Sequence, residues 1–368
     1  MIQKIGKALI LLWVAMCGGL NNLDGQVKTD KTPVVYHDKL EFKEDGTAYY
    51  KGSLYTGESW EYFTSPRQLH EKFTWLNGKK HGTYTEYNED GTVIATDNWK
   101  NGVKHGPFDY KYGLGQKKSN GTFYEGTLDG EVFGYYVNGA PKYYSQYNRG
   151  IRNGKTVTYF SDGDVEQISF FKNDKPDGTI YSYYPDSLIR SEIQYKNGIK
   201  DGYSYRYHLS GCPAEESYYK NGELDSVLRV YEDINCRLIN QSGLKNGKKD
   251  GVFLTFDFLG DTLLACNYVD GELDGMYISW ESRQIETMGK YVLGQKEGYW
   301  YHNMSTGKQL RHGRYEGNMM VGKWYFYDLD GYLLFTNTYG ADEEVIKQKF
   351  YKRKKKCIFV YPHKNEQQ

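Results

Sequence analysis

The sequence predicts an all-β protein, an elongated single-layer array of about twelve antiparallel β-hairpins with a 24-residue repeat. Two observations predict this fold: paired glycines recur at a nearly constant spacing, and aromatic residues recur with them. The segments between are rich in strand-forming residues, while the recurring glycines and the absence of a 3.6-residue apolar period disfavour helix. A globular β-sandwich also contains regular short strands, but the constant period favours a linear array.

The first glycine of each unit marks the period. Successive units are separated by 26 residues, then by 24 six times, then by 25, 24, 23 and 23. Asp174 fills the one slot without glycine, and Ser226 replaces the second glycine of its unit. The first glycines are Gly52, Gly78, Gly102, Gly126, Gly150, Gly198, Gly222, Gly247, Gly271, Gly294 and Gly317. The second glycines are Gly57, Gly82, Gly106, Gly130, Gly154, Gly178, Gly202, Gly251, Gly275, Gly298 and Gly322.

Aromatic residues occupy two places in the unit, one three residues before the first glycine and one five residues after the second. At the first place the exceptions are Leu244 and Arg314, and at the second they are Lys111 and Asn303. The first set is Tyr49, Trp75, Trp99, Phe123, Tyr147, Phe171, Tyr195, Tyr219, Tyr268 and Tyr291. The second set is Tyr62, Tyr87, Tyr135, Tyr159, Tyr183, Tyr207, Tyr231, Phe256, Trp280 and Tyr327.

Each unit is predicted to be a β-hairpin. In one copy, a strand over 83–87 is followed by a turn at 89–92 and a return strand over 93–99. The next turn falls at Asn101 and Gly102, residue types that tolerate positive φ. Because side chains alternate along a strand, large residues fall on both faces of the sheet. We therefore expect a twisted or curled single layer with aromatic columns running from hairpin to hairpin.

Residues 1–25 resemble an export signal, with a basic start at Lys4 and Lys7 and an apolar run that is too short to span a membrane. The residues before Cys17 also resemble a bacterial lipobox, although Met16 departs from the small residue expected there. The sequence therefore predicts a periplasmic, cell-surface or secreted protein, with lipid anchoring at Cys17 as one alternative and a cytoplasmic protein as another.

The remaining chain divides into a linker at 26–39, the repeat array at 40–340, and a C-terminal cap with a basic tail at 341–368. The tail contains a run of five basic residues at 352–356, followed by a predicted end-capping strand at 357–361. The basic run is interpreted first as a solvated guard against strand addition and second as a contact for an anionic membrane or polyanion.

The repeat resembles a known family. The segments 50–57 and 195–202 (YKGSLYTG and YKNGIKDG) are similar to the opening unit and the core of the variant MORN repeat. The resemblance covers roughly residues 40–340 and implies a hairpin array. Bacterial proteins of this make-up are often labelled YwqK-type antitoxins, although this chain departs from an intracellular antitoxin by its leader. The family implies no universal binding residues, so none is assigned.

Composition and motifs exclude several classes of function. The 47 basic residues balance the 47 acidic ones, which argues against a nucleic-acid partner. Hydrolase and dinucleotide-binding glycine motifs are absent, so no catalytic, cofactor-binding or metal-ligating residues are predicted, and the chain is predicted not to be an enzyme. His81 and His105 stand at matched places one unit apart and are interpreted as solvated loop residues rather than as a ligand pair.

The sequence favours an exported, non-enzymatic repeat scaffold that binds a protein or envelope partner through an extended tyrosine-rich surface. The alternatives are a toxin-neutralising or immunity protein and a glycan-binding envelope protein; a membrane surface is a further expected contact. Cys212 and Cys236 are predicted to be free thiols, because equivalent sites in consecutive hairpins lie about 9.6 Å apart. A disulfide needs Cα atoms within about 6.8 Å.

Overall fold

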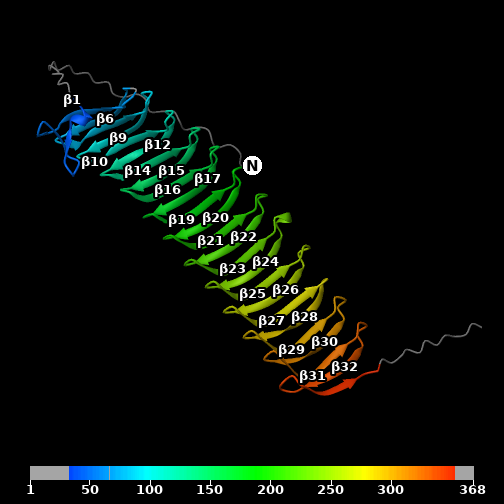
Figure 1. Cartoon of the computed structure of the whole chain (residues 1–368). Coiled ribbons are helices and arrows are strands. Elements are labelled where there is room, and N and C mark those ends of the chain that lie inside the picture. Colours follow the sequence, from blue (N-terminus) through cyan, green and yellow to red (C-terminus); the bar gives the residue numbers. More distant parts are fainter. Residues whose placement is uncertain (1–32, 66, 353–368) are drawn as a thin grey trace, which may run out of the picture.

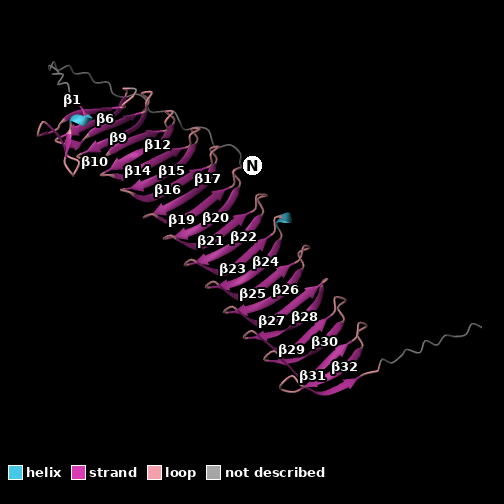
Figure 2. Ribbon diagram, viewed as in Figure 1, coloured by secondary structure: helices cyan, strands magenta, loops and turns pink. Residues whose placement is uncertain are grey.

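The computed structural model describes residues 33–65 and 67–352. The predicted all-β hairpin array is confirmed: one long, open, mostly antiparallel sheet of 30 strands runs the length of the molecule (Figure 1). A second sheet of three short strands lies at its N-terminal end. Helix within the described residues is limited to two three-residue 3-10 turns, η1 (His37–Lys39) and η2 (Ile234–Cys236) (Figure 2).

The strands follow one another in chain order. The first nine are β1 (Val34–Tyr36), β2 (Glu41–Phe42), β3 (Ala48–Tyr50), β4 (Ser53–Leu54), β5 (Gly57–Tyr62), β6 (Leu69–Leu76), β7 (Lys79–Lys80), β8 (Gly82–Tyr87) and β9 (Val93–Lys100). The next are β10 (Val103–Lys104), β11 (Gly106–Lys111), β12 (Lys117–Tyr124), β13 (Thr127–Leu128), β14 (Gly130–Tyr135), β15 (Pro141–Asn148), β16 (Ile151–Tyr159) and β17 (Val165–Lys172).

The middle of the array contains β18 (Lys175–Pro176), β19 (Gly178–Tyr183), β20 (Ile189–Lys196), β21 (Ile199–Tyr207), β22 (Pro213–Lys220), β23 (Glu223–Tyr231), β24 (Leu238–Lys245) and β25 (Lys248–Phe256). The C-terminal part contains β26 (Thr262–Val269), β27 (Glu272–Glu281), β28 (Gln284–Val292), β29 (Gln295–Asn303), β30 (Gln309–Glu316), β31 (Met319–Tyr327), β32 (Leu333–Tyr339) and β33 (Val345–Phe350).

Two-residue turns form one edge of the sheet, and they explain the first glycine of each unit. In the turn between β9 and β10, Asn101 and Gly102 have φ angles of 54° and 88°. Such primed turns match the twist of the strands but need positive φ at both residues. Each turn is also tied to the one before it, since the Gly102 N–H donates to the carbonyl of Lys80 at 2.8 Å and the Gly126 N–H to that of Lys104 at 2.8 Å.

Five-residue loops form the other edge and are also linked at the repeat spacing. The hydroxyl of Tyr112 donates to the carbonyl of Tyr135 at 2.9 Å, and that of Tyr136 to the carbonyl of Tyr159 at 2.8 Å. The Asn88 side chain makes the same kind of bond to the carbonyl of Gly113 at 2.7 Å. Both edges therefore bind each hairpin to the next, which gives the nearest-neighbour coupling expected of a linear array.

A β-bulge recurs at the loop end of each return strand. Between β8 and β9, Val93 pairs with Tyr87 and Ala95 pairs with Glu86, so Ile94 is the extra residue. The same register shift occurs between β5 and β6 and along the rest of the array. A bulge lets two consecutive side chains share a face and increases the local twist.

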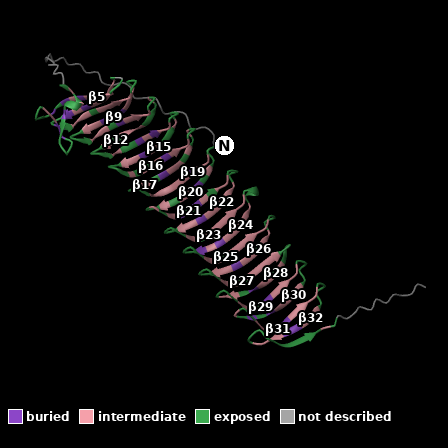
Figure 3. Ribbon diagram, in the orientation of Figure 1, coloured by how far each residue is buried: buried purple, intermediate pink, exposed green. Residues whose placement is uncertain are grey.

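The two faces of the sheet differ in packing. The packed face contains Trp75, Phe108, Val132, Trp300 and Trp324, each no more than 6% exposed. Small buried residues stand between these large side chains, one per unit, at Ser145, Ser169, Ser217, Ser242 and Cys266. The other face, called the open face here, lacks such a buried column, and most of the sheet is only partly buried (Figure 3). A single layer therefore places its core along one face rather than between two sheets.

The N-terminal end of the array is covered by its own small cluster. Leu40, Ala48 and Tyr55 pack with Phe73 and Trp75 into a buried group. Strand β1 pairs in parallel with β5. The predicted leader with Cys17, most of the basic run and the predicted strand at 357–361 lie outside the described residues.

One sequence exception is explained by the turn chemistry. The turn between β30 and β31 reads Gly317-Asn318 instead of Asn-Gly, with φ angles of 58° and 71°. Tyr315, not Arg314, thus stands three residues before the second turn residue, and it pairs with Gly298 as Trp99 pairs with Gly82. The aromatic column therefore continues without a break at this unit.

The prediction of free thiols at Cys212 and Cys236 was wrong. The two residues form a disulfide with Cα atoms 4.9 Å apart. The loop after β23 spans 232–237 and has one residue more than the loop at 208–212. The longer loop contains η2, in which Asn235 and Cys236 have φ angles of 60° and 52°. This turn brings the loop back toward its neighbour, so the spacing of flat strands does not apply there.

Candidate functional site

An apolar column on the open face is the first candidate site. It consists of the residue that directly follows the second glycine position of each unit. In five consecutive units this residue is apolar: Tyr203, Val227, Val252, Met276 and Tyr299. Their register places them opposite Tyr218, Gly243, Asn267, Lys290 and Arg314, on the face away from Ser204, Phe253 and Trp300.

The column is exposed over most of its length. Tyr203 and Met276 are each 53% exposed, Val252 is 48% exposed and Tyr299 is 62% exposed. The five residues span four repeat steps, which is about 38 Å at two strands per step. In the N-terminal half the same position is mostly polar or charged, with Thr83, Glu131 and Lys155 as examples, all of them exposed. The strands between these residues place Asn267 and Lys290 in the same row, so the column is a series of exposed apolar side chains separated by polar ones. Exposed apolar groups set among polar residues are typical of an interaction surface.

Aromatic rings and charges gather at the N-terminal end of this column. The rings of Tyr203 and Tyr205 stack with centroids 5.9 Å apart, and the ring of Tyr218 meets that of Tyr203 edge-on at 5.1 Å. They line a hollow of about 550 Å³ whose rim includes Arg229, ion-paired to Glu216 at 3.2 Å. Flat rings beside charged groups can stack on a planar or pyranose ligand and also bond to its hydroxyls.

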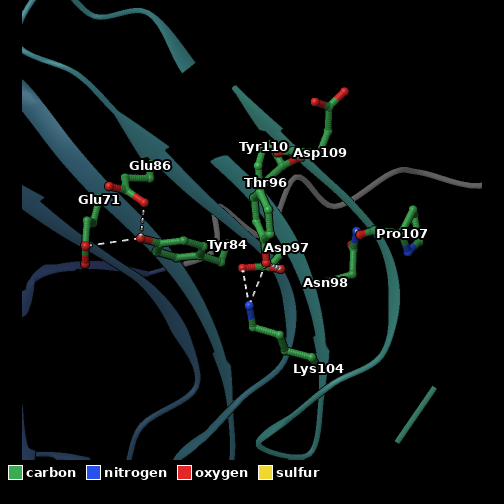
Figure 4. A network of polar contacts seen from close by, with 10 residues as sticks. All are labelled: Glu71, Tyr84, Glu86, Thr96, Asp97, Asn98, Lys104, Pro107, Asp109 and Tyr110. Atoms are coloured by element: carbon green, nitrogen blue, oxygen red, sulfur yellow. Dashed lines mark hydrogen bonds and ion pairs between the residues drawn. The ribbon is translucent and has the colours of Figure 1, made fainter. Parts of the chain in front are cut away.

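A polar groove on the packed face of the first units is the second candidate site. It has a volume of about 650 Å³, and Figure 4 shows part of its lining: Glu71, Tyr84, Glu86, Asp97, Lys104 and Tyr110. The buried carboxylate of Asp97 accepts hydrogen bonds from Tyr110 at 2.6 Å and from the Lys104 ammonium at 2.9 Å. Burial raises the pKa of Tyr110, and the hydrogen bond to Asp97 adds to this effect. Although burial opposes it, hydrogen bonding to Tyr110 and Asp97 raises the pKa of Lys104.

At the loop end of the same groove, the Tyr84 hydroxyl lies between two carboxylates (Figure 4). It is 3.1 Å from Glu71 Oε1 and 3.2 Å from Glu86 Oε2. Burial and the two negative charges strongly raise the pKa of Tyr84, so it stays a protonated donor. His70 lies beside them: one ligand atom from each of His70, Glu71 and Glu86 falls within 4.8 Å of the other two.

Cations cover the aromatic column of the packed face. The ammonium of Lys80 lies 4.3 Å from the ring centroid of Phe73, and that of Lys200 lies 4.6 Å from Tyr219. The guanidinium of Arg152 lies 4.3 Å from Phe171, and Lys296 lies 4.8 Å from Trp300. Each contact contributes about 0.5–1 kcal/mol at an exposed site. These side chains shield the packed face, whereas the column from Tyr203 to Tyr299 on the open face is exposed over most of its length.

The residues singled out from the sequence lie elsewhere. His105 stacks near Tyr124, and its Nδ1 accepts a bond from the Glu125 N–H at 3.4 Å. His81 Nδ1 is buried without a hydrogen-bond partner among the described residues. Lys352 is exposed at the end of the described chain. Sequence reasoning did not single out His70, because strict alternation of side chains along a strand places it on the opposite face from Glu71.

The comparisons identify the repeat. Residues 80–101 match the family model described as a MORN repeat variant. No curated protein matches the chain. None of the helices in the described part of the chain has the length and apolar character to cross a membrane.

Several solved structures have some likeness to the chain, including the following two. The crystal structure of TcdB2-TccC3-Cdc42 is 10% identical over 84% of this chain and 19% of that chain, with a TM-score of 0.15. The Photorhabdus luminescens Tc holotoxin pore is 9% identical over 84% of this chain and 20% of that chain, with a TM-score of 0.15. The chain thus spans about a fifth of those chains, and a likeness at this score has no bearing on function.

Proposed function

We propose that this chain, a MORN-repeat protein, is an exported, non-enzymatic scaffold that binds a protein partner along the apolar column of its open face. The observation that supports this proposal is the column itself, from Tyr203 to Tyr299. Its side chains are exposed, apolar and regularly spaced, whereas the opposite face is packed and covered by cations. Tyrosine and methionine are well suited to such a surface because they combine a large contact area with adaptable packing.

Export is part of the proposal because of the disulfide between Cys212 and Cys236. Disulfides persist in oxidising compartments and are rare in the cytosol. The bond joins two loops that the turn hydrogen bonds already connect, so it stabilises the array at the start of the column. This supports the periplasm, the cell surface or the medium as the site of action, in agreement with the export signal predicted at 1–25.

The test compares two variants that change the same position in different halves of the array. One replaces Tyr203, Val252, Met276 and Tyr299 by Ser, and its matched control replaces Thr83, Glu131 and Lys155 by Ser. Affinity capture from the native envelope should recover partners with the wild type and the control, and more than roughly tenfold less with the column variant. Circular dichroism checks that all three remain folded. Equal capture by the two variants would exclude the column as the binding surface.

Glycan binding is the second candidate function, and the hollow lined by Tyr203, Tyr205 and Tyr218 favours it. A screen against cell-wall and capsule polysaccharides separates the two functions, since a glycan-binding protein retains a carbohydrate in the absence of any protein. A toxin-neutralising role remains a proposal from the repeat resemblance, and it predicts that the captured partner is a toxin whose activity this chain suppresses.

A further inference from the structure

We propose that His70, Glu71 and Glu86 bind a divalent transition-metal ion of the Zn²⁺ class on the packed face, between β6 and β8. The three residues are half-buried, and their ligand atoms lie within 4.8 Å of one another. Ligands that bind Zn²⁺ at about 2.0–2.2 Å are at most ~4.4 Å apart. Small rotations of the two glutamate side chains therefore close the site. This inference goes beyond the proposed scaffold function.

The β-bulge explains why two consecutive residues can serve as ligands. Tyr62 pairs with Leu69 and Glu61 pairs with Glu71, so His70 is the extra residue of this bulge. In an undistorted strand, His70 and Glu71 would point to opposite faces. The bulge lets both side chains lie on the packed face, where Glu86 stands directly opposite Glu71. The His70 ring also packs on Phe63 with centroids 4.2 Å apart, which limits its motion.

The arrangement of the carboxylates at this place favours a cation. Glu61, Glu71 and Glu86 stand directly opposite one another across three neighbouring strands. Like charges in directly opposite positions are destabilising. None of the three forms an ion pair with another residue of the described chain. A bound divalent ion would neutralise this row.

Nearby cations are engaged elsewhere. The Lys80 ammonium lies over the rings of Phe73 and Trp99, at 4.3 and 4.9 Å from their centroids. Lys104 is bonded to Asp97. Neither lysine therefore takes the place of a metal ion between the carboxylates.

The donor set selects the class of metal. One imidazole nitrogen with two carboxylate oxygens suits Zn²⁺ and similar ions, whereas Ca²⁺ and Mg²⁺ prefer oxygen ligands alone. The Tyr84 hydroxyl lies 3.1 Å from Glu71 Oε1 and 3.2 Å from Glu86 Oε2, so it donates to one of the two carboxylates and orients it. The described residues supply three ligands, fewer than the four of a closed tetrahedral site, and two of them, Glu71 and Glu86, also line the groove of about 650 Å³. Such an open site can accept a water molecule or a group from a partner.

The site is specific to the first full hairpins. In the following units, the two residues that correspond to His70 and Glu71 are Ile94-Ala95, Lys118-Ser119 and Lys142-Tyr143. The bulge itself is therefore a general property of the repeat, while the ligands are not. Substitution of the ligand residues should therefore remove metal binding and leave the fold of the array intact.

The experiment uses the purified, chelator-treated full chain and Zn²⁺ alone in equilibrium dialysis, with metal content measured by mass spectrometry. We expect one Zn²⁺ per wild-type chain and a rise in melting temperature on binding. His70→Asn and the pair Glu71→Gln with Glu86→Gln should each weaken binding by more than about 100-fold, since even outer-shell changes cost 10–100-fold. His105→Asn is the matched control and should bind as the wild type does.

Two results would overturn the proposal. The first is absence of Zn²⁺ binding by the folded wild type. The second is a Zn²⁺-induced rise in melting temperature that is unchanged in both His70→Asn and Glu86→Gln. Should His70→Asn fail to fold, Glu86→Gln alone decides, because it is isosteric and also relieves the repulsion with Glu71. The metal-free Glu86→Gln chain should therefore be at least as stable as the metal-free wild type.

Discussion

Replacing Gly313 by Ala tests the packing of the buried column at one of its tight points. Gly313 lies on β30 with an extended backbone that any residue adopts, so the change introduces no backbone strain. A Cβ atom there would lie 2.2 Å from Cδ2 of Trp324, at the fused part of its ring. Ordinary carbon contacts are about 3.5–4.0 Å. The indole ring or the strand must therefore move by more than about 1 Å.

The Trp324 ring has little freedom to make that movement. It is 0% exposed, and its Nε1 donates to the carbonyl of Arg314 at 3.1 Å. The Tyr315 ring packs against it edge-on, with centroids 4.9 Å apart. Overpacking of a core by a methyl group typically costs about 1–3 kcal/mol. We expect a loss at the upper end, about 3 kcal/mol, less up to ~1 kcal/mol from the reduced backbone entropy of alanine.

The assay is a double-mutant cycle with Trp324→Ala, measured by urea unfolding with circular dichroism and by hydrogen exchange of β30 to β32. Trp324→Ala alone should cost about 3–5 kcal/mol. In that background the added methyl meets open space, so Gly313→Ala should cost less than about 0.5 kcal/mol. Additive effects of the two changes would refute the steric argument. Exchange is needed because a repeat array can unfold locally.

Three other perturbations test separate parts of the structure. Burial, with the charges of Arg311 and Lys296, lowers the pKa of His302 to about 4, so the unfolded chain binds a proton between pH 6.5 and 4 that the folded chain does not. The free energy of unfolding should therefore fall by on the order of 2 kcal/mol as the pH drops through that window. In His302→Asn the urea midpoint should depend less on pH over the same range. Replacing Cys212 and Cys236 by Ser should cost about 3.5 kcal/mol, the chain-entropy value for a loop of their 24-residue separation, and peptide mapping without reductant should recover the two residues cross-linked in the wild type. Deleting residues 126–149 should leave a folded array because it removes one whole repeat, whereas deleting 126–137 should not, and equal damage by circular dichroism would argue against nearest-neighbour coupling.

The period and the turns could be predicted from the sequence because each depends on local chemistry. Asn101-Gly102 requires a turn with positive φ wherever it stands, and the recurrence of that pair fixes the hairpin length. The same repeat length also predicts the position of the aromatic residue, three places before the turn glycine of each unit. The exception at Arg314 also has a local cause. The turn residues are reversed to Gly317-Asn318, so the aromatic residue of this unit is Tyr315, one place later in the sequence.

The contacts between hairpins could not be predicted in the same way. The bond between Cys212 and Cys236 depends on a loop that is one residue longer and contains η2, and sequence spacing alone gives only the flat-strand separation. The site at His70 depends on a bulge, which breaks the strict alternation used to assign faces. Both features arise where the chain departs from a regular strand. A sequence periodicity describes only what the repeats have in common, so it does not predict such local departures.

The two faces of the long sheet differ in how their side chains are shielded from water, because the described array is a single layer. On the packed face, the small residue of each unit is matched to the size of its neighbour. It is glycine at Gly289 and Gly313, which lie against Trp300 and Trp324. It is serine or cysteine, as at Ser242 and Cys266, where the neighbouring side chain is smaller than tryptophan. Lys200 and Lys296 then shield the rings from water. No equivalent cover exists on the open face over the stretch from Tyr203 to Tyr299, where exposed apolar side chains replace the polar residues of the N-terminal half. The same position is mostly polar in the first half of the array, so the repeat does not itself demand the exposed apolar residues from Tyr203 to Tyr299, and this difference supports the proposed partner surface there.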